Sequence, residues 1–228
     1  MPSSPHYHGH RQRLRQRFLR SGFKGLADHE VIEIILTLAI PRSDVKVPAK
    51  ALLERFGSLR GVLDAPLSDL QAVEGIGEVS AISIHIIRES ATRYLQESTE
   101  GAEVLLEADR LSDFWRMRIG ALKHEVFAVA YLDSGYRLLR NGVELLQEGT
   151  IDRAAVYPRR VVEAALHRQA AALVLAHNHP NGQVEPTEHD QIIIRAIVLA
   201  ADTINLRVVD HLIVSPDQTY SFRQVGLL

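Results

Sequence analysis

The chain has 228 residues, of which 46% are hydrophobic and 24% charged, and its formal net charge at pH 7 is −2. These values are ordinary for a soluble globular protein with one large or two small domains. The chain contains no cysteine, which excludes disulfide bonds and thiolate metal ligands.

No apolar run approaches the roughly 18–20 residues needed to span a bilayer. The amino end, MPSSPHYHGHRQRLRQR, lacks the apolar stretch of a signal peptide. We therefore expect a cytoplasmic protein without membrane contact.

The first half of the chain is predicted to be helical, because apolar residues recur at helical spacing and no stretch alternates like a strand. Asp28 is expected to cap the second helix and Gly57 to close the third. The predicted helical segments are residues 11–22, 26–40, 45–63 and 67–95.

The amino-terminal 27 residues carry a concentrated positive charge and no Asp or Glu. Such a segment is either a solvated helix face or a contact for phosphate. Its basic residues are Arg11, Arg13, Arg15, Arg17, Arg20 and Lys24. The motif HYHGH precedes them, and we expect a disordered or loosely helical tail there because no carboxylate lies nearby in the sequence.

The stretch LQAVEGIGEVSAISI has the pattern of a helix-hairpin-helix, in which Gly75 and Gly77 permit a tight turn. The first N–H groups of the next helix can then meet a phosphate of DNA. Glu74 and Glu78 flank the hairpin, which weakens phosphate binding. A structural or protein-docking hairpin stays open, and Arg11, Arg13 and Arg15 are the candidate charges for a DNA site.

The polar segment QESTEGAE, residues 96–103, separates this half from the next. Beyond it, strand-like and helical patterns mix, so we predict an all-helical domain over residues 1–98 and an α+β or α/β domain over residues 104–228. The predicted strands are residues 125–133, 137–146, 171–179 and 206–215, and the predicted helices are residues 109–120, 157–170 and 187–204.

The motif HNHP ends the apolar run AALVLA, which is predicted to be a buried strand. Residues i and i+2 share a face of a strand, so His177 and His179 can point the same way and Asn178 the other. Two neutral imidazoles side by side can each reach one zinc ion at about 2.0–2.1 Å. Pro180 ends the strand and turns the chain.

The segment T-E-H-D then begins a helix. Thr187 is a good N-cap with Asp190 as third helical residue, as in a capping box, and capping alone would explain both. Together with the two histidines, however, Asp190 completes a set of three ligands with a fourth position open for water, the pattern of a catalytic zinc site.

H-x-H-P followed by T-x-x-D resembles the JAMM signature of the JAB/MPN metalloprotease fold. The stretches LVLAHNHPNG, DHLIV, EGTIDRAAVYPRRVVEAAL and YSFRQVGLL are similar to the bacterial RadC family in particular. The resemblance covers residues 105–228, and the first half resembles the helical N-terminal region of that family. It implies a cytidine-deaminase-like mixed sheet with flanking helices.

The resemblance also implies the roles of the site residues. His177, His179 and Asp190 correspond to the zinc ligands, and Thr187 stands at the position of a serine. The family's general base is a glutamate from an earlier strand, for which Glu144 is our assignment, with Glu148 and Glu125 as competitors. The Thr187 hydroxyl is expected to donate to the developing oxyanion.

The implied activity is zinc-dependent hydrolysis of an amide or isopeptide bond in a protein or peptide substrate. The alternative is a DNA-associated repair or recombination accessory protein whose metal site is not catalytic. His211, in a predicted buried strand, is expected to be a core histidine.

Overall fold

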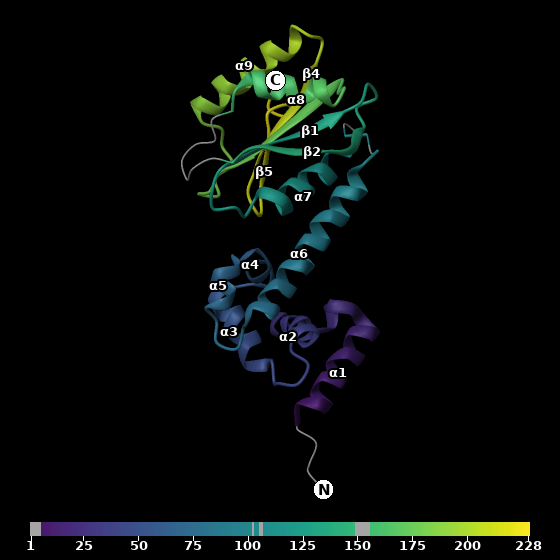
Figure 1. Ribbon diagram of the computed structural model, residues 1–228, viewed down its shortest axis with the longest axis vertical. Helices are drawn as coiled ribbons and strands as arrows, with labels where there is room; N and C mark the ends of the chain where they lie inside the picture. Colours follow the sequence, from purple (N-terminus) through teal and green to yellow (C-terminus); the bar gives the residue numbers. More distant parts are fainter. Residues whose placement is uncertain (1–5, 102, 105–106, 149–155) are drawn as a thin grey trace. The chain divides into compact units, whose positions relative to one another are not determined.

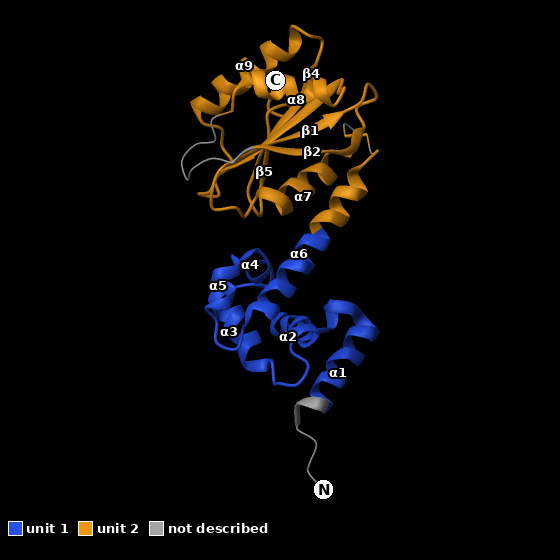
Figure 2. Cartoon of the chain, in the orientation of Figure 1, with its two compact units in different colours: residues 1–91 blue, residues 92–228 orange. Residues whose placement is uncertain are grey.

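The computed structural model describes residues 6–101, 103–104, 107–148 and 156–228. The chain forms two compact units, residues 1–91 and 92–228 (Figure 2). The division falls inside helix α6 (Glu78–Thr99), ahead of the polar segment in which the sequence analysis placed the boundary. Ala102 of that segment lies outside the described residues.

The described part of the first unit is helical, as predicted (Figure 1). Leu36, Leu52 and Leu70 lie at the centre of its core and are fully buried. The elements before α6 are α1 (His6–Ser21), the 3-10 helix η1 (Gly22–Gly25), α2 (Asp28–Ala39), α3 (Lys46–Phe56), α4 (Leu59–Asp64) and α5 (Leu67–Gln71).

Two helix ends show how local chemistry sets these bounds. Gly57 ends α3 with a φ of 78°, a left-handed conformation that glycine adopts without strain. The expected N-cap Asp28 is wrong, because Asp28 is already the first residue of α2 and Ala27 is the cap. The Glu30 carboxylate accepts a hydrogen bond from the Ala27 N–H at 3.0 Å and so replaces a capping side chain.

Helix α1 includes the residues expected to form a disordered or loosely helical tail, and the premise that no carboxylate lies near them is wrong for His10. The ring of His10 lies 2.7 Å from a carboxylate oxygen of Glu33, which is buried in α2. Arg17 donates to both carboxylate oxygens of Glu30. These acids are distant in sequence, so the pattern of the amino end could not reveal them; the side chains of His6 and His8 lie outside the described residues.

Arg11 also holds α1 against the rest of the unit. Its guanidinium is buried and donates to the carbonyl oxygens of Pro41 at 2.6 Å, of Ile40 at 3.0 Å and of Ser43. Ile40 is the C-cap of α2, and Pro41 and Ser43 follow it, so the cation lies near the end of the helix that favours positive charge. The prediction that Arg11 contacts nucleic acid is therefore corrected: its charge is used inside the unit.

The second unit is an α+β domain built on a five-stranded mixed sheet with the strand order β2-β1-β3-β4-β5. Strands β3 and β4 run parallel and the other neighbours are antiparallel. The strands are β1 (Val126–Leu132), β2 (Leu138–Glu148), β3 (Ala172–Asn178), β4 (Arg207–Val214) and β5 (Thr219–Ser221), and the helices are α7 (Ala108–Ile119), α8 (Pro158–His167) and α9 (Glu188–Asp202). The short β5 was not predicted.

Helices cover both faces of this sheet, with α7 on one face and α8 and α9 on the other (Figure 1). Alternate residues of β1 follow this division, since Ala128 and Ala130 pack on the α7 side and Phe127, Val129 and Tyr131 on the other. Every residue of β1 and β3 is consequently buried, which explains why β1 and the first five residues of β3 are all apolar.

Among the helices of the described residues, none combines the length and the apolarity needed to cross a bilayer.

We expect Arg11→Ala to lower the free energy of unfolding of the first unit by about 1.5–3 kcal/mol, the usual contribution of hydrogen bonds to a charged group. Amide hydrogen exchange in α1 and α2 of the full chain measures this loss. Arg13→Ala is the matched control, because Arg13 lies two residues away on the same helix and is exposed. Equal protection in the two variants would contradict the structural role of Arg11.

Candidate metal centre

The end of β3 places two histidines on one face of the sheet. His177 belongs to the strand and is 2% exposed, whereas His179 follows it and is half-buried. Their rings meet edge to face at 4.7 Å between centroids. The alternation of a strand, predicted from the sequence, therefore holds one residue beyond its last hydrogen-bonded position.

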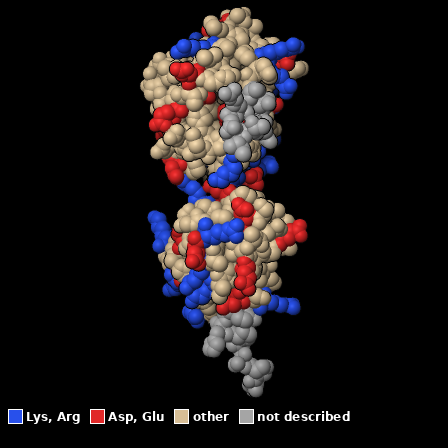
Figure 3. Space-filling view, turned by 90° about the vertical axis from the view of Figure 1, so that its left-hand side faces the viewer, with Lys and Arg blue, Asp and Glu red and all other residues tan. Residues whose placement is uncertain are grey.

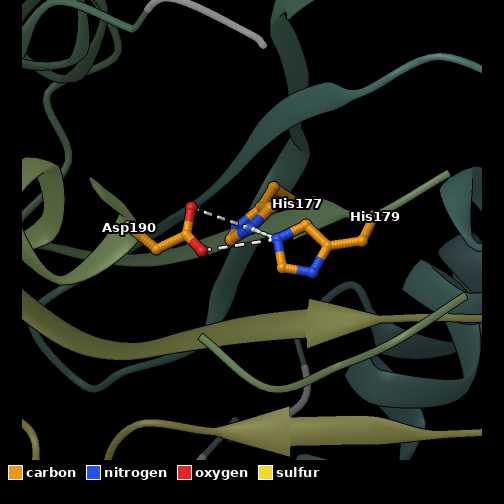
Figure 4. A group of neighbouring side chains, drawn as sticks. All are labelled: His177, His179 and Asp190. Atoms are coloured by element: carbon orange, nitrogen blue, oxygen red, sulfur yellow. Dashed lines mark hydrogen bonds and ion pairs between the residues drawn. The ribbon is translucent and has the colours of Figure 1, made fainter. Parts of the chain in front are cut away.

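Asp190, in the first turn of α9, completes a group with these histidines (Figure 4). The two Nε2 atoms lie 2.9 Å apart. The carboxylate oxygens of Asp190 lie 3.4 Å from Nε2 of His177 and 3.3 Å from Nε2 of His179. We call these three residues the His–His–Asp group.

The spacing of the group suits a metal ion. Ligands at the 2.0–2.1 Å typical of zinc lie about 3.3 Å from one another in a tetrahedral arrangement. Two imidazole lone pairs and a carboxylate at such distances repel unless a ring proton or a metal ion lies between them. Three protein ligands leave a tetrahedral ion one free position, so the donor set fits a site of the catalytic kind.

Burial and charge act differently on the three members of the group. Burial lowers the pKa of His177 to about 4, so its ring is neutral at pH 7. The hydrogen bond to Asp190 raises the pKa of His179. Burial alone would raise the pKa of Asp190, but hydrogen bonds from His179 and Thr187 and the charge of His177 hold that pKa well below its usual range.

The Nδ1 atom of His179 is directed away from the group, to the carbonyl oxygen of Gln183 at 3.0 Å. A proton on Nδ1 leaves the Nε2 lone pair for a metal. The turn that brings Gln183 back uses Gly182, whose φ is 79° and whose N–H donates to the carbonyl of His179. Asn181 accepts from the N–H of Gln183 and closes the same turn.

The cap of α9 fixes Asp190, as the sequence predicted. Thr187 accepts from the Asp190 N–H at 3.2 Å, and Asp190 in return accepts from the Thr187 N–H at 2.7 Å. The Thr187 hydroxyl also donates to the Asp190 carboxylate at 2.7 Å. Thr187 therefore holds a ligand in place, and the donation to an oxyanion expected of it stays a prediction.

Asn178 faces the opposite way and ties β3 to the start of β1. Its side-chain oxygen accepts from the N–H of Val126 at 2.9 Å. Its side-chain nitrogen donates to the carbonyls of Leu122 and His124 at 3.2 and 3.0 Å. These three bonds fix the backbone on both sides of Glu125.

Glu125 is the acidic residue that the structure brings beside the His–His–Asp group. In the antiparallel pair of β1 and β3, Phe127 lies opposite His177. Glu125 directly precedes β1 and His179 directly follows β3, so both leave the paired strands at the same end. Glu125 lines a small pocket together with His177 and Asp190. Its negative charge adds to the effect of Asp190 in raising the pKa of His179.

Glu144, our assignment for the general base, is not brought to the group. It pairs with Val129 of β1, so two strand spacings and two residues separate it from His177, about 12 Å between Cα atoms. Its carboxylate accepts from the Tyr131 hydroxyl at 2.9 Å and from Arg168 at 3.1 Å. Both partners draw it away from His177, so the geometry argues against Glu144 and favours its competitor Glu125.

The third candidate, Glu148, has a described backbone that pairs with Val126 at the end of β2. Its side chain lies outside the described residues.

His211 of β4 is the residue near the group whose contact the sequence did not reveal. It is fully buried, as expected of a core histidine. Its Nε2 lies 2.9 Å from Nδ1 of His177, and the two rings stack at 4.8 Å. This contact depends on the parallel pairing of β3 with β4, which no local pattern specifies.

The residues predicted to contact nucleic acid lie in the first unit, and the structure separates Arg11 from the others. Gly75 has a φ of 84° and turns the chain between α5 and α6, and Gly77 is exposed directly before α6. Arg13 and Arg15 are exposed on α1. On the face shown in Figure 3, acidic and basic side chains of this unit lie interspersed.

Comparison with known proteins matches each half of the chain to a protein family. Residues 105–227 match the family described as the RadC-like JAB domain, and residues 8–82 match the family described as UPF0758 N-terminal. A UPF0758 protein of Burkholderia cenocepacia (strain HI2424) is 37% identical over 217 residues, which cover 95% of this chain and 84% of the relative. Another, of Paraburkholderia phytofirmans, is 39% identical over 212 residues, covering 93% of this chain and 81% of the relative.

We expect the full chain, purified without a histidine tag, to bind about one zinc ion per chain, and His177→Ala to lose it, because two of three ligands cannot hold the ion. Elemental analysis after dialysis against a weak chelator measures the content. His167→Ala is the control, since His167 is an exposed histidine at the end of α8. Full zinc content in His177→Ala would exclude His177 as a ligand.

Proposed function

The chain belongs to the RadC-like JAB domain family, and we propose that it is a zinc-dependent hydrolase that cleaves an amide or isopeptide bond in a protein or peptide. The observation that carries the proposal is the convergence of the His–His–Asp group on one point, with the remaining ring nitrogens of both histidines engaged elsewhere.

The chemistry divides among residues that the fold brings together. His177, His179 and Asp190 would hold a zinc ion, which would supply Lewis acidity toward a substrate carbonyl and a bound water. Glu125 accepts the proton of the attacking water and returns it to the leaving nitrogen. Asn178 keeps Glu125 in position through the backbone on either side of it.

Two features support a hydrolytic role over a purely structural metal site. A structural zinc ion is usually enclosed by four protein ligands, whereas three candidate ligands converge here among the described residues. A half-buried carboxylate, Glu125, lies beside the ligands and lines the same pocket. A site that served stability alone would have no need of this acid.

A DNA-associated role is the second candidate. It is favoured by the turn at Gly75, which directs the exposed start of α6 outward from the first unit's core, where backbone N–H groups can meet a phosphate. The exposed Arg13 and Arg15 are the remaining basic candidates on α1. The two candidates concern different units and can both hold for one chain.

We expect Glu125→Gln to lower the rate of hydrolysis about 10²–10⁴-fold, the usual contribution of a general base, while its zinc content stays that of the wild type. The assay uses zinc-loaded full chain with a panel of internally quenched peptides joined by peptide bonds or by lysine isopeptide bonds. Glu144→Gln is the matched control and should keep nearly full activity. The assignment of Glu125 fails if Glu144→Gln is the slower variant, or if both retain wild-type rates.

If the first unit binds DNA, Arg13→Ala/Arg15→Ala should weaken binding and reduce the slope of log K against log salt by about 2, since each phosphate contact contributes roughly 0.9. Fluorescence anisotropy with a labelled duplex over a series of salt concentrations gives the slope. Gly75→Val, which the left-handed φ disfavours, tests the hairpin separately. Binding that is indifferent to both changes would remove these residues from any DNA site.

A further inference from the structure

We propose that His211 is a positioning residue of the metal centre: it accepts the Nδ1–H of His177 and thereby fixes the tautomer and the ring plane in which His177 offers Nε2 to the metal. This inference rests on the proposed function, because it assumes that His177 is a ligand.

The first step is the protonation pattern of His177. A neutral imidazole has one N–H and one lone pair. Its Nε2 faces His179 and Asp190, and its Nδ1 faces Nε2 of His211 at 2.9 Å. If Nε2 is to coordinate, the proton must lie on Nδ1, and His211 must accept it through its own Nε2.

The second step follows for His211 itself. With Nε2 as acceptor, its proton lies on Nδ1, which is buried and has no hydrogen-bond partner in the part of the chain that the structure describes. A buried donor without a partner is unfavourable, and a histidine that served packing alone would be expected to find one. The unsatisfied nitrogen is therefore the cost of presenting an acceptor to His177.

The surroundings of His211 keep this arrangement fixed. Phe222 packs against its ring at 88° and 4.7 Å between centroids, and Phe127 stacks at 6.1 Å. Its backbone is held on both sides, since its N–H donates to the side chain of Asp210 and its carbonyl accepts from the N–H of Phe222. The aromatic rings beside His211 offer no hydrogen-bond acceptor or donor to its Nε2. Among the described residues, the polar atom that Nε2 contacts is Nδ1 of His177.

The two histidines of the group differ in the kind of residue that contacts their Nδ1 atoms. His179 directs its Nδ1 to a carbonyl of the following turn, the usual kind of supporting partner for a metal-ligating histidine. His177 lies inside the sheet, where the strand carbonyls are engaged in the ladder with β1 and β4. A side chain from the neighbouring strand is then the acceptor that can reach it.

Zinc affinity of the full chain, measured by competition with a chromogenic chelator, tests the proposal. We expect His211→Leu to weaken zinc binding about 10–100-fold, the usual effect of losing a partner that orients a ligand. His211→Gln should recover most of the affinity, because the amide oxygen of glutamine reaches about as far as Nε2 and accepts the same hydrogen bond. Equal affinities of the wild type and His211→Leu would overturn the proposal.

A second measurement holds even if His211→Leu fails to fold. Long-range ¹H–¹⁵N spectra of the zinc-loaded wild type report which ring nitrogen of each histidine carries the proton. We expect Nδ1 for both His177 and His211, and a proton on Nε2 of His211 would overturn the proposal. A merely structural role in packing would not require this pattern.

The reference variant His177→Ala separates the two levels of inference. Zinc retained by His177→Ala would overturn the proposed function. Zinc lost by His177→Ala but kept at full affinity by His211→Leu would overturn the role of His211 and leave the proposed function standing.

Discussion

The alternation of side chains at the end of β3 is the constraint on which the rest of the site depends. His177 and His179 point to one face and Asn178 to the other, so three consecutive residues serve two purposes. One face carries the two histidines of the His–His–Asp group, while the other fixes the segment that carries Glu125. Because β3 lies in the middle of the sheet, with both faces covered, His177 and Asn178 rest on a rigid element, and His179 follows directly after it.

The electrostatics of the group follow from the same arrangement. A buried carboxylate is costly unless its charge is compensated, and Asp190 meets this cost through the start of α9, where N–H groups and the helix dipole favour an anion. Thr187 adds two hydrogen bonds to the same carboxylate. Burial meanwhile keeps His177 neutral, which is the form that coordinates a metal. The helix cap thus favours the ionised carboxylate of Asp190, and the buried strand favours the neutral ring of His177, within the same group.

The sequence predicted the features of the site that depend on near neighbours and missed those that depend on strand order. The histidine pair and the cap at Thr187 are set by spacings of two and three residues, and the structure shows both. The sequence alone could not place Glu144 and Glu125 relative to the group, because that requires knowing that β1, rather than β2, lies beside β3; the identity of the general base stays a prediction. Arg11 was misjudged for a similar reason, because the carbonyls that bind its charge lie about 30 residues away in the chain.

Each member of the His–His–Asp group is supported by a hydrogen bond from outside the group. Two of the supporting interactions come with the motif itself: the turn through Gln183 supports His179, and the cap at Thr187 supports Asp190. The third, from His211 to His177, comes from β4 and exists because that strand pairs in parallel with β3. A chain could therefore keep HNHP and the T-x-x-D cap and still present a misoriented His177 if β4 shifted in register. On the proposed function, the motif supplies the candidate ligands, whereas the pairing of the strands sets the orientation of His177, the most buried of them.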